Sequence, residues 1–151
     1  MANPFPFVAA SILTAAELNG IGEYTAYTPT FTNLTVGNGT VSFRYGRVNK
    51  FIHVIGRVTF GSTTSITGSV TATLPVTASY DGLQTIGLTR VTDNSGSTYQ
   101  GRVTLSSSTL FGPNVDNVIG TRIEAQGYSA TIPFTWTTSD SINVSYYYEA
   151  A

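Results

Sequence analysis

The amino-acid sequence predicts an all-β protein: an antiparallel β-sandwich, jelly-roll-like in type, preceded by an N-terminal arm with a short helical turn. The chain of 151 residues contains 15 Gly and 6 Pro, with 12% aromatic and only 10% charged residues, which is typical of short strands joined by turns. From Tyr27 onward, apolar residues recur with period two. Turn residues interrupt this alternation at short intervals, as they do in two-sheet domains of eight or nine strands.

Residues 1–26 differ from the rest, and we interpret them as a docking arm followed by a β-sandwich domain at residues 27–151. Thr14 as N-cap and Glu17 three residues later form a capping box, which predicts a helical turn ending at Asn19-Gly20. A helix this short does not persist alone in water, so the arm has to dock. The residues expected to make the contact are Phe5, Phe7, Val8, Ile12, Leu13 and Leu18. The alternative is that this segment packs across its own domain.

The arm is expected to be neither a secretion signal nor a membrane anchor. A signal peptide needs positive charge before its apolar stretch, whereas the first Lys or Arg of this chain is Arg44. No apolar run approaches the roughly 20 residues of a membrane-spanning helix.

The first part of the β domain predicts three strands within residues 28–60. The first two are expected to form a hairpin around Asn38-Gly39, and the next two a hairpin around Asn49-Lys50. Alternation places one apolar face of each strand toward a core. The expected core residues are Val41, Phe43 and Tyr45 in one strand and Ile52, Val54, Val58 and Phe60 in the next, leaving His53, Ile55 and Arg57 on the opposite face.

The second part predicts a loop at residues 61–68, a strand at 69–74 ended by Pro75, and a hairpin of residues 83–92 with 98–106. A polar connection at residues 107–120 and strands near 121–126, 129–136 and 141–149 complete the pattern. In the last strand, Ile142, Val144, Tyr146 and Tyr148 share one face, and Asn143, Ser145, Tyr147 and Glu149 share the other.

Charge and composition argue against several functions. Seven Lys and Arg against eight Asp and Glu give a net charge of -1, which offers no basic field for nucleic acid or an anionic membrane. The sequence "FRYGRVNKF" interleaves basic and aromatic residues, but alternation turns Phe43 and Tyr45 away from Arg44. Cys is absent, so neither a disulfide nor a thiolate metal site is expected, and no cofactor is predicted.

No catalytic constellation is recognisable. His53 is the only histidine, and it lies within a predicted strand, which favours an ordinary surface or interface residue. Two carboxylates could serve glycoside hydrolysis, although most candidates lie in or beside turns, where Asp commonly caps its own backbone. These candidates are Asp81, Asp93, Asp116, Glu124 and Asp140. A calcium site in "DNSGS" or "PNVDN" is a weaker alternative. We therefore predict no enzyme activity and no metal site.

The C-terminal "SYYYEA" places Tyr146, Tyr147 and Tyr148 in a row. Tyrosine combines an apolar body with a polar tip, which suits a core, a subunit interface or a sugar. We expect core or subunit contacts in preference to glycan contacts.

The segments "YTAYTPTFTNLTVGNGTVSFRYGRVNKFIHVIGRVTFGSTTSITGSV", "LPVTAS" and "SATIPFTWTTSDSINVSYYYEA" together resemble a β-rich module of tailed-bacteriophage virion proteins, of the head-decoration and minor tail type. The preceding "LTAAELNGIGEY" is similar to the short segment that often precedes this module. The resemblance covers nearly the whole chain, and its motifs are structural.

The resemblance implies a structural virion protein, often a homotrimer, that faces outward from the particle. The expected partner of the arm is a major capsid or tail protein, and the expected location is the virion surface after assembly in the host cytoplasm. A capsid decoration or head-fibre protein is favoured over a minor tail or tail-tip protein. The alternative is an adhesin that binds host-surface glycans through loops such as residues 61–68 and 107–120.

Overall fold

The computed structural model describes residues 20–151, the side chain of Ile119 excepted. Within them there are ten antiparallel strands and no helix, which confirms the prediction of an all-β antiparallel protein. The strands are β1 (Tyr24–Tyr27), β2 (Phe31–Thr35), β3 (Thr40–Val48), β4 (Phe51–Thr59), β5 (Ser65–Thr73), β6 (Thr85–Thr92), β7 (Thr98–Ser107), β8 (Leu110–Ile119), β9 (Arg122–Gly127) and β10 (Ser141–Glu149). The capping box at Thr14 and Glu17 and the six apolar arm residues lie outside the described part of the chain.

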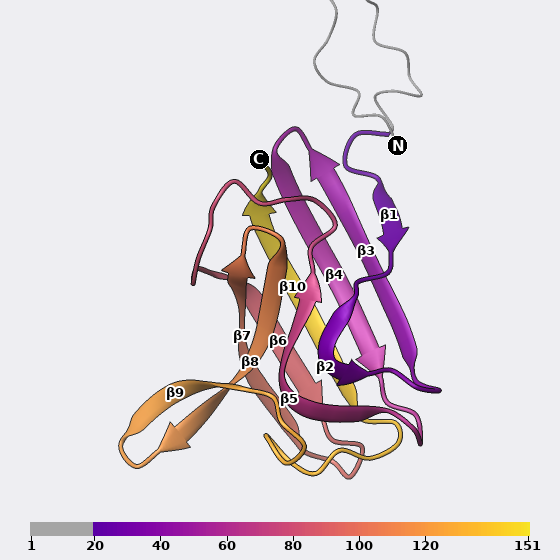
Figure 1. The fold of residues 1–151 in the computed structure, drawn as a ribbon, viewed down its shortest axis with the longest axis vertical. Coiled ribbons are helices and arrows are strands. Elements are labelled where there is room, and N and C mark those ends of the chain that lie inside the picture. Colours follow the sequence, from indigo (N-terminus) through magenta and orange to yellow (C-terminus); the bar gives the residue numbers. More distant parts are fainter. Residues whose placement is uncertain (1–19) are drawn as a thin grey trace, which may run out of the picture.

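All ten strands join in one curled sheet (Figure 1). Their order is β1-β3-β4-β10-β6-β7-β8-β5-β2, and β9 pairs with β8. Although β2 and β3 are far apart in this order, the rings of Phe31 on β2 and Phe43 on β3 lie with centroids 6.2 Å apart. The sheet therefore curls into a half-barrel whose concave side encloses the core.

The core confirms the predicted strand faces. Ile52 and Val54 of β4 and Tyr146 of β10 are fully buried. The ring centroid of Phe111 lies 4.6 Å from that of Tyr146 and 6.4 Å from that of Phe43, so one aromatic cluster spans the interior. Since paired positions in an antiparallel sheet share a face, the intervening residues of β4 and β10 form the outer, solvent-facing side.

Two predicted hairpins are confirmed. Val48 of β3 pairs with Phe51 of β4 across a two-residue turn in which Asn49 has a φ of 54°. The β6–β7 hairpin closes through the Asp93 N–H, which donates to the carbonyl of Ser97 at 2.9 Å. In both hairpins, the turn residues lie directly between the two paired strands in the sequence. The pairing can therefore be predicted from a short stretch of sequence.

The hairpin predicted at Asn38-Gly39 is wrong, because β2 pairs with β5 and β3 pairs with β1 and β4. A turn does form, with the Gly39 N–H donating to the Val36 carbonyl at 2.9 Å. Asn38, however, bonds across to another loop: its backbone N–H donates to Thr63 Oγ1, and its Oδ1 accepts from the Thr63 backbone N–H, both at 2.9 Å. Asn38 therefore links the turn between β2 and β3 to the loop between β4 and β5.

Four other boundaries differ from the sequence prediction. Residues 107–120, predicted to be a loop, contain β8, whose Phe111 and Val115 are buried. Residues 129–136, predicted to be a strand, form only an isolated bridge between Ser129 and Ile132. β5 begins at Ser65, inside the loop predicted at residues 61–68. The boundary predicted between arm and domain, after residue 26, falls inside β1, which pairs with β3.

Candidate functional site

The outer face of the sheet carries a continuous row of polar side chains across five strands. Ser42 pairs with Arg57, Arg57 with Asn143, Asn143 with Arg90, and Arg90 with Gln100. These five residues, here called the polar row, come from β3, β4, β10, β6 and β7 and are exposed except for the half-buried Asn143. Neighbouring strands lie about 4.8 Å apart, so Arg57 and Arg90, separated by one strand, stand about 10 Å apart.

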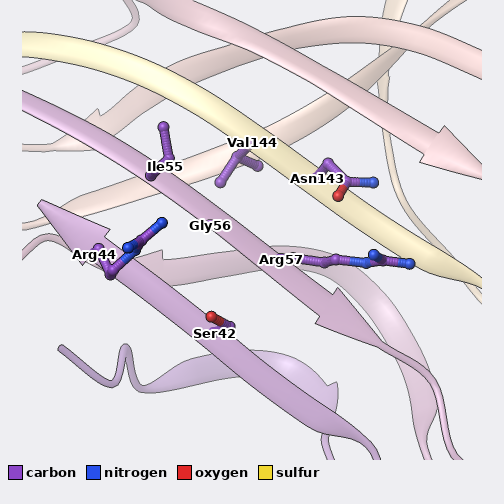
Figure 2. Close-up of a pocket in the computed structure, with 7 residues that line it drawn as sticks. All are labelled: Ser42, Arg44, Ile55, Gly56, Arg57, Asn143 and Val144. Atoms are coloured by element: carbon purple, nitrogen blue, oxygen red, sulfur yellow. The ribbon is translucent and has the colours of Figure 1, made fainter. Parts of the chain in front are cut away.

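Two adjoining hollows follow this row. The first, of about 300 Å³, is lined by Ser42, Arg44, Arg57 and Asn143, which Figure 2 shows placed around the backbone of Gly56. The second, also of about 300 Å³, is lined by Leu88, Thr89, Arg90, Gln100, Gly101, Asn143, Val144 and Ser145. Because both are lined by Asn143 and Val144, they form one shallow trough across the outer face.

The charged side chains that line the trough are all positive. Of residues 20–151, Arg44, Arg57 and Arg90 line it, and no carboxylate does. Among the described residues, the one ion pair is between Arg102 and Asp116, with Nη2 and Oδ1 2.7 Å apart, so these three arginines have no carboxylate within 4.0 Å. Each guanidinium presents several N–H donors in a planar fork that matches carboxylate or phosphate oxygens.

The row beside the polar row mixes arginine with apolar side chains. Arg44 pairs with Ile55, Ile55 with Ser145, Ser145 with Leu88, and Leu88 with Arg102. The Leu88 side chain is 71% exposed. Ile55 and Leu88 therefore give the trough apolar surface between its charged groups.

His53 lies one row further along the same face. Its Nδ1 is hydrogen-bonded to the Tyr24 hydroxyl, and its Nε2 lies 3.3 Å from Ser145 Oγ. A Ser-His-Asp triad places a carboxylate on the far side of the imidazole, and here a tyrosine hydroxyl occupies that position. The cluster ties β1, β4 and β10 together.

The five carboxylates singled out in the sequence are not gathered into one site. Asp140 is fully buried and accepts hydrogen bonds from backbone N–H groups, while Asp116 bonds Arg102. Asp116 pairs with Ala125 and Glu124 with Asn117, so Asp116 and Glu124 point to opposite faces of β8 and β9.

Asp93 caps its own turn, as the sequence predicts: its Oδ1 accepts from the Ser95 backbone N–H at 2.8 Å, and hydrogen bonds with Ser95 lower the pKa of this carboxyl. Within residues 20–151, no three His, Asp or Glu side chains are grouped so as to hold a metal ion.

The three C-terminal tyrosines divide between core and surface. Tyr146 and Tyr148 are buried, so their rings cannot reach a glycan or a second subunit in this fold. Tyr147 is 60% exposed and stacks on Phe51, which is 53% exposed, with ring centroids 6.0 Å apart. A hollow of about 540 Å³ beside this pair is also lined by Tyr80.

Both ends of the described chain lie beside this aromatic surface. The Gly22 backbone lies next to the Val48 side chain, and Tyr24 pairs with Gly46, near the tip of the β3–β4 hairpin. At the other end of the chain, the Ala150 N–H donates to the Lys50 carbonyl at 2.7 Å. The arm therefore joins the domain at the end of the sheet where Tyr147 and Phe51 are exposed.

A two-stranded ribbon projects from the opposite end of the sheet. It consists of β9 and the part of β8 that pairs with it, and it extends away from the end marked N and C in Figure 1. Val118 and Ile123 are direct partners in this ribbon, and each is 68% exposed. The sequence predicts the β9 half of this ribbon, near residues 121–126, but not the β8 half, because residues 107–120 are predicted to be a polar connection. The available signal for β8 was the period-two pattern of Phe111, Pro113 and Val115, all of which are buried.

Comparisons of the chain with models of protein families, with curated proteins and with solved structures found no match. Within the described residues, there is no helix long and apolar enough to cross a membrane.

Proposed function

We propose that this chain is a structural virion protein of a tailed bacteriophage, a capsid decoration or head-fibre protein whose N-terminal arm binds a major capsid or tail protein. The β domain faces outward at the virion surface, after assembly in the host cytoplasm, and has no catalytic role. A minor tail or tail-tip protein is the alternative position. The observation that carries an assembly role is the projecting β8–β9 ribbon.

The ribbon has the properties of a subunit contact. A two-stranded ribbon is marginally stable in water unless it packs against something else. Within residues 20–151, β9 has few neighbours beyond its pairing with β8, and its first five residues, Arg122 to Gln126, are exposed or half-exposed. Burying Val118 and Ile123 against another subunit would remove two large apolar side chains from water. This supports a homo-oligomer, and we propose a trimer.

The point at which the arm joins the domain supports a second, separate contact. Residues 20–24 lie beside the β3–β4 hairpin tip, and the ribbon projects at the far end of the sheet (Figure 1). A partner held by Phe5, Phe7, Val8, Ile12, Leu13 and Leu18 would be connected to the domain through the end opposite the ribbon. One domain could in this way contact the particle at one end and a sister subunit at the other.

The finer fold assignment, a two-layered jelly-roll-like sandwich, is part of the proposal. The contact between Phe31 and Phe43 supports two facing layers, because it joins strands far apart in the sheet order.

Particle incorporation tests the proposed function. Phage particles assembled with the full chain should carry it, and deletion of Met1–Asn19 should abolish incorporation while the separately purified domain still folds. Folding is checked by the fluorescence of Trp136, the sole tryptophan, which stacks on Phe60 with ring centroids 4.6 Å apart. Incorporation of the truncated chain at the normal level, or absence of the full chain from particles, would contradict the proposal.

A further inference from the structure

We infer that the trough on the outer face of the sheet is a binding site for an acidic glycan, a saccharide polymer that carries carboxylate or phosphate groups. The site consists of the polar row with Arg44 and the apolar side chains of Ile55 and Leu88. This inference goes beyond the proposed structural role.

The anionic character of the ligand follows from the arginines. Among the described residues, Arg44, Arg57 and Arg90 line the two adjoining hollows without a carboxylate partner, whereas Arg102, on the same row as Arg44, is neutralised by Asp116. The backbones at Arg57 and Arg90 lie about 10 Å apart, because one strand separates them. Arg44 is a diagonal neighbour of Arg57 on the adjacent strand, with Cα atoms about 7 Å apart. Spaced cations of this kind fit an anion that repeats along a chain better than a single small anion.

The saccharide character follows from the residues between the arginines. Ser42, Asn143 and Gln100 alternate with the two guanidinium groups along the row. Amide and hydroxyl groups both donate and accept, which matches sugar hydroxyls. Ile55 and Leu88 supply apolar surface for the C–H faces of sugar rings.

A nucleic acid fits this surface less well. Binding of single strands relies on aromatic side chains that stack on bases, and no aromatic residue in the described part of the chain lines either hollow. The net charge of -1 also lacks the broad positive field that attracts a nucleic-acid backbone.

Titration calorimetry of the full chain at physiological ionic strength tests the inference. The probes are polygalacturonate, a glycerol-phosphate polymer, neutral dextran and polythymidylate. At least one of the first two should bind, and dextran should not. Binding of polygalacturonate alone would identify carboxylate as the recognised group, and binding of the glycerol-phosphate polymer alone would identify phosphate.

The decisive variant combines Arg57→Gln with Arg90→Gln. Its control combines Lys50→Gln with Arg122→Gln, which removes the same amount of positive charge from side chains outside the trough. All four side chains are exposed, so both double variants should fold, as checked by Trp136 fluorescence. The first should weaken binding about tenfold or more, and the second less than about twofold. Binding of neither acidic polymer, equal losses in the two variants, or tighter binding of polythymidylate than of either polymer would overturn the inference.

Discussion

The hydroxyl of Tyr27 on β1 lies 3.0 Å from the hydroxyl of Tyr146 on β10, and this hydrogen bond crosses the interior of the curled sheet. Two strands, β3 and β4, separate β1 from β10 in the sheet order, so the contact is possible because the sheet curls. Burial raises the pKa of Tyr27 to about 12, although the hydrogen bond with Tyr146 opposes the shift. Burial also raises the pKa values of Tyr146, Tyr128 and Tyr148.

Alkaline pH should therefore destabilise the protein. An unfolded tyrosine loses its proton near pH 10, whereas folded Tyr27 keeps it until about pH 12. Above pH 10 the unfolded chain binds fewer protons than the folded chain, so the free energy of unfolding falls as pH rises. The stabilisation is fully present below pH 10 and is lost progressively as pH rises through the folded pKa. Urea unfolding followed by Trp136 fluorescence from pH 8 to pH 12 measures this slope.

The Tyr27→Phe variant separates this effect from general alkaline denaturation. Removing the titrating hydroxyl should lower the slope of stability against pH, between pH 10 and 12, by up to about 1.4 kcal/mol per pH unit. Tyr80→Phe, at a side chain that is 49% exposed, should follow the parent curve and serves as the control. A slope unchanged in Tyr27→Phe would contradict the prediction.

Gly56→Ala should destabilise the fold by about 1–3 kcal/mol, because a Cβ at this position would lie 2.2 Å from the Phe43 ring. The ring packs within the aromatic core and cannot withdraw without disturbing Phe111. Gly68→Ala is the matched control within a strand, since its Cβ would lie 3.4 Å from the nearest atom of Asn33. Urea midpoints compare the two variants, and equal stability would show that the Phe43 ring moves freely.

Asp140→Ala should cost about 3 kcal/mol of unfolding free energy. The buried carboxylate accepts from the Asn94 backbone N–H at 2.9 Å and the Thr137 backbone N–H at 2.5 Å, and alanine would leave both donors without an acceptor. Asp81→Ala, at an exposed position, should change stability by less than about 0.5 kcal/mol. Chemical denaturation of the two variants decides whether Asp140 stabilises the fold through these two hydrogen bonds, and a small loss in Asp140→Ala would argue against this role.

The double variant Val118→Thr with Ile123→Thr should lower the oligomeric state of the protein without unfolding it. Threonine keeps the strand preference of the ribbon while removing apolar surface. Leu83→Thr, at a side chain that is 89% exposed and lies outside the ribbon, is the control and should leave the molecular mass unchanged. Light scattering at several concentrations gives the mass. A parent chain that is monomeric throughout would refute the ribbon as a contact between copies.

The faces of the strands and the local hairpins were predictable from the sequence. Ile52 and Val54 are buried and Arg57 is exposed, as the period-two pattern predicts, because alternation is a property of the extended backbone itself. The β3–β4 and β6–β7 hairpins were predictable for a similar reason, since their turn residues lie between the two strands they join. The roles of Phe5, Thr14 and the rest of the arm stay predictions, because residues 1–19 lie outside the described structure.

The non-local pairings were not predictable in this way. Asn38-Gly39 has hairpin chemistry, yet β2 pairs with β5, and Asn38 instead bonds Thr63. Tyr146 and Tyr148 were candidates for external contacts, and their burial depends on how far the sheet curls around the core.

The candidate site was also predictable from the sequence only in part. By itself, the sequence determined that Arg57 and Asn143 lie on faces opposite the core, because side chains alternate along any strand. Only the tertiary structure decided that β10 lies between β4 and β6, which brings Arg57, Asn143 and Arg90 into one row. The physical reason is that strand neighbours are selected by burial of the whole apolar face, to which segments distant in the chain contribute together.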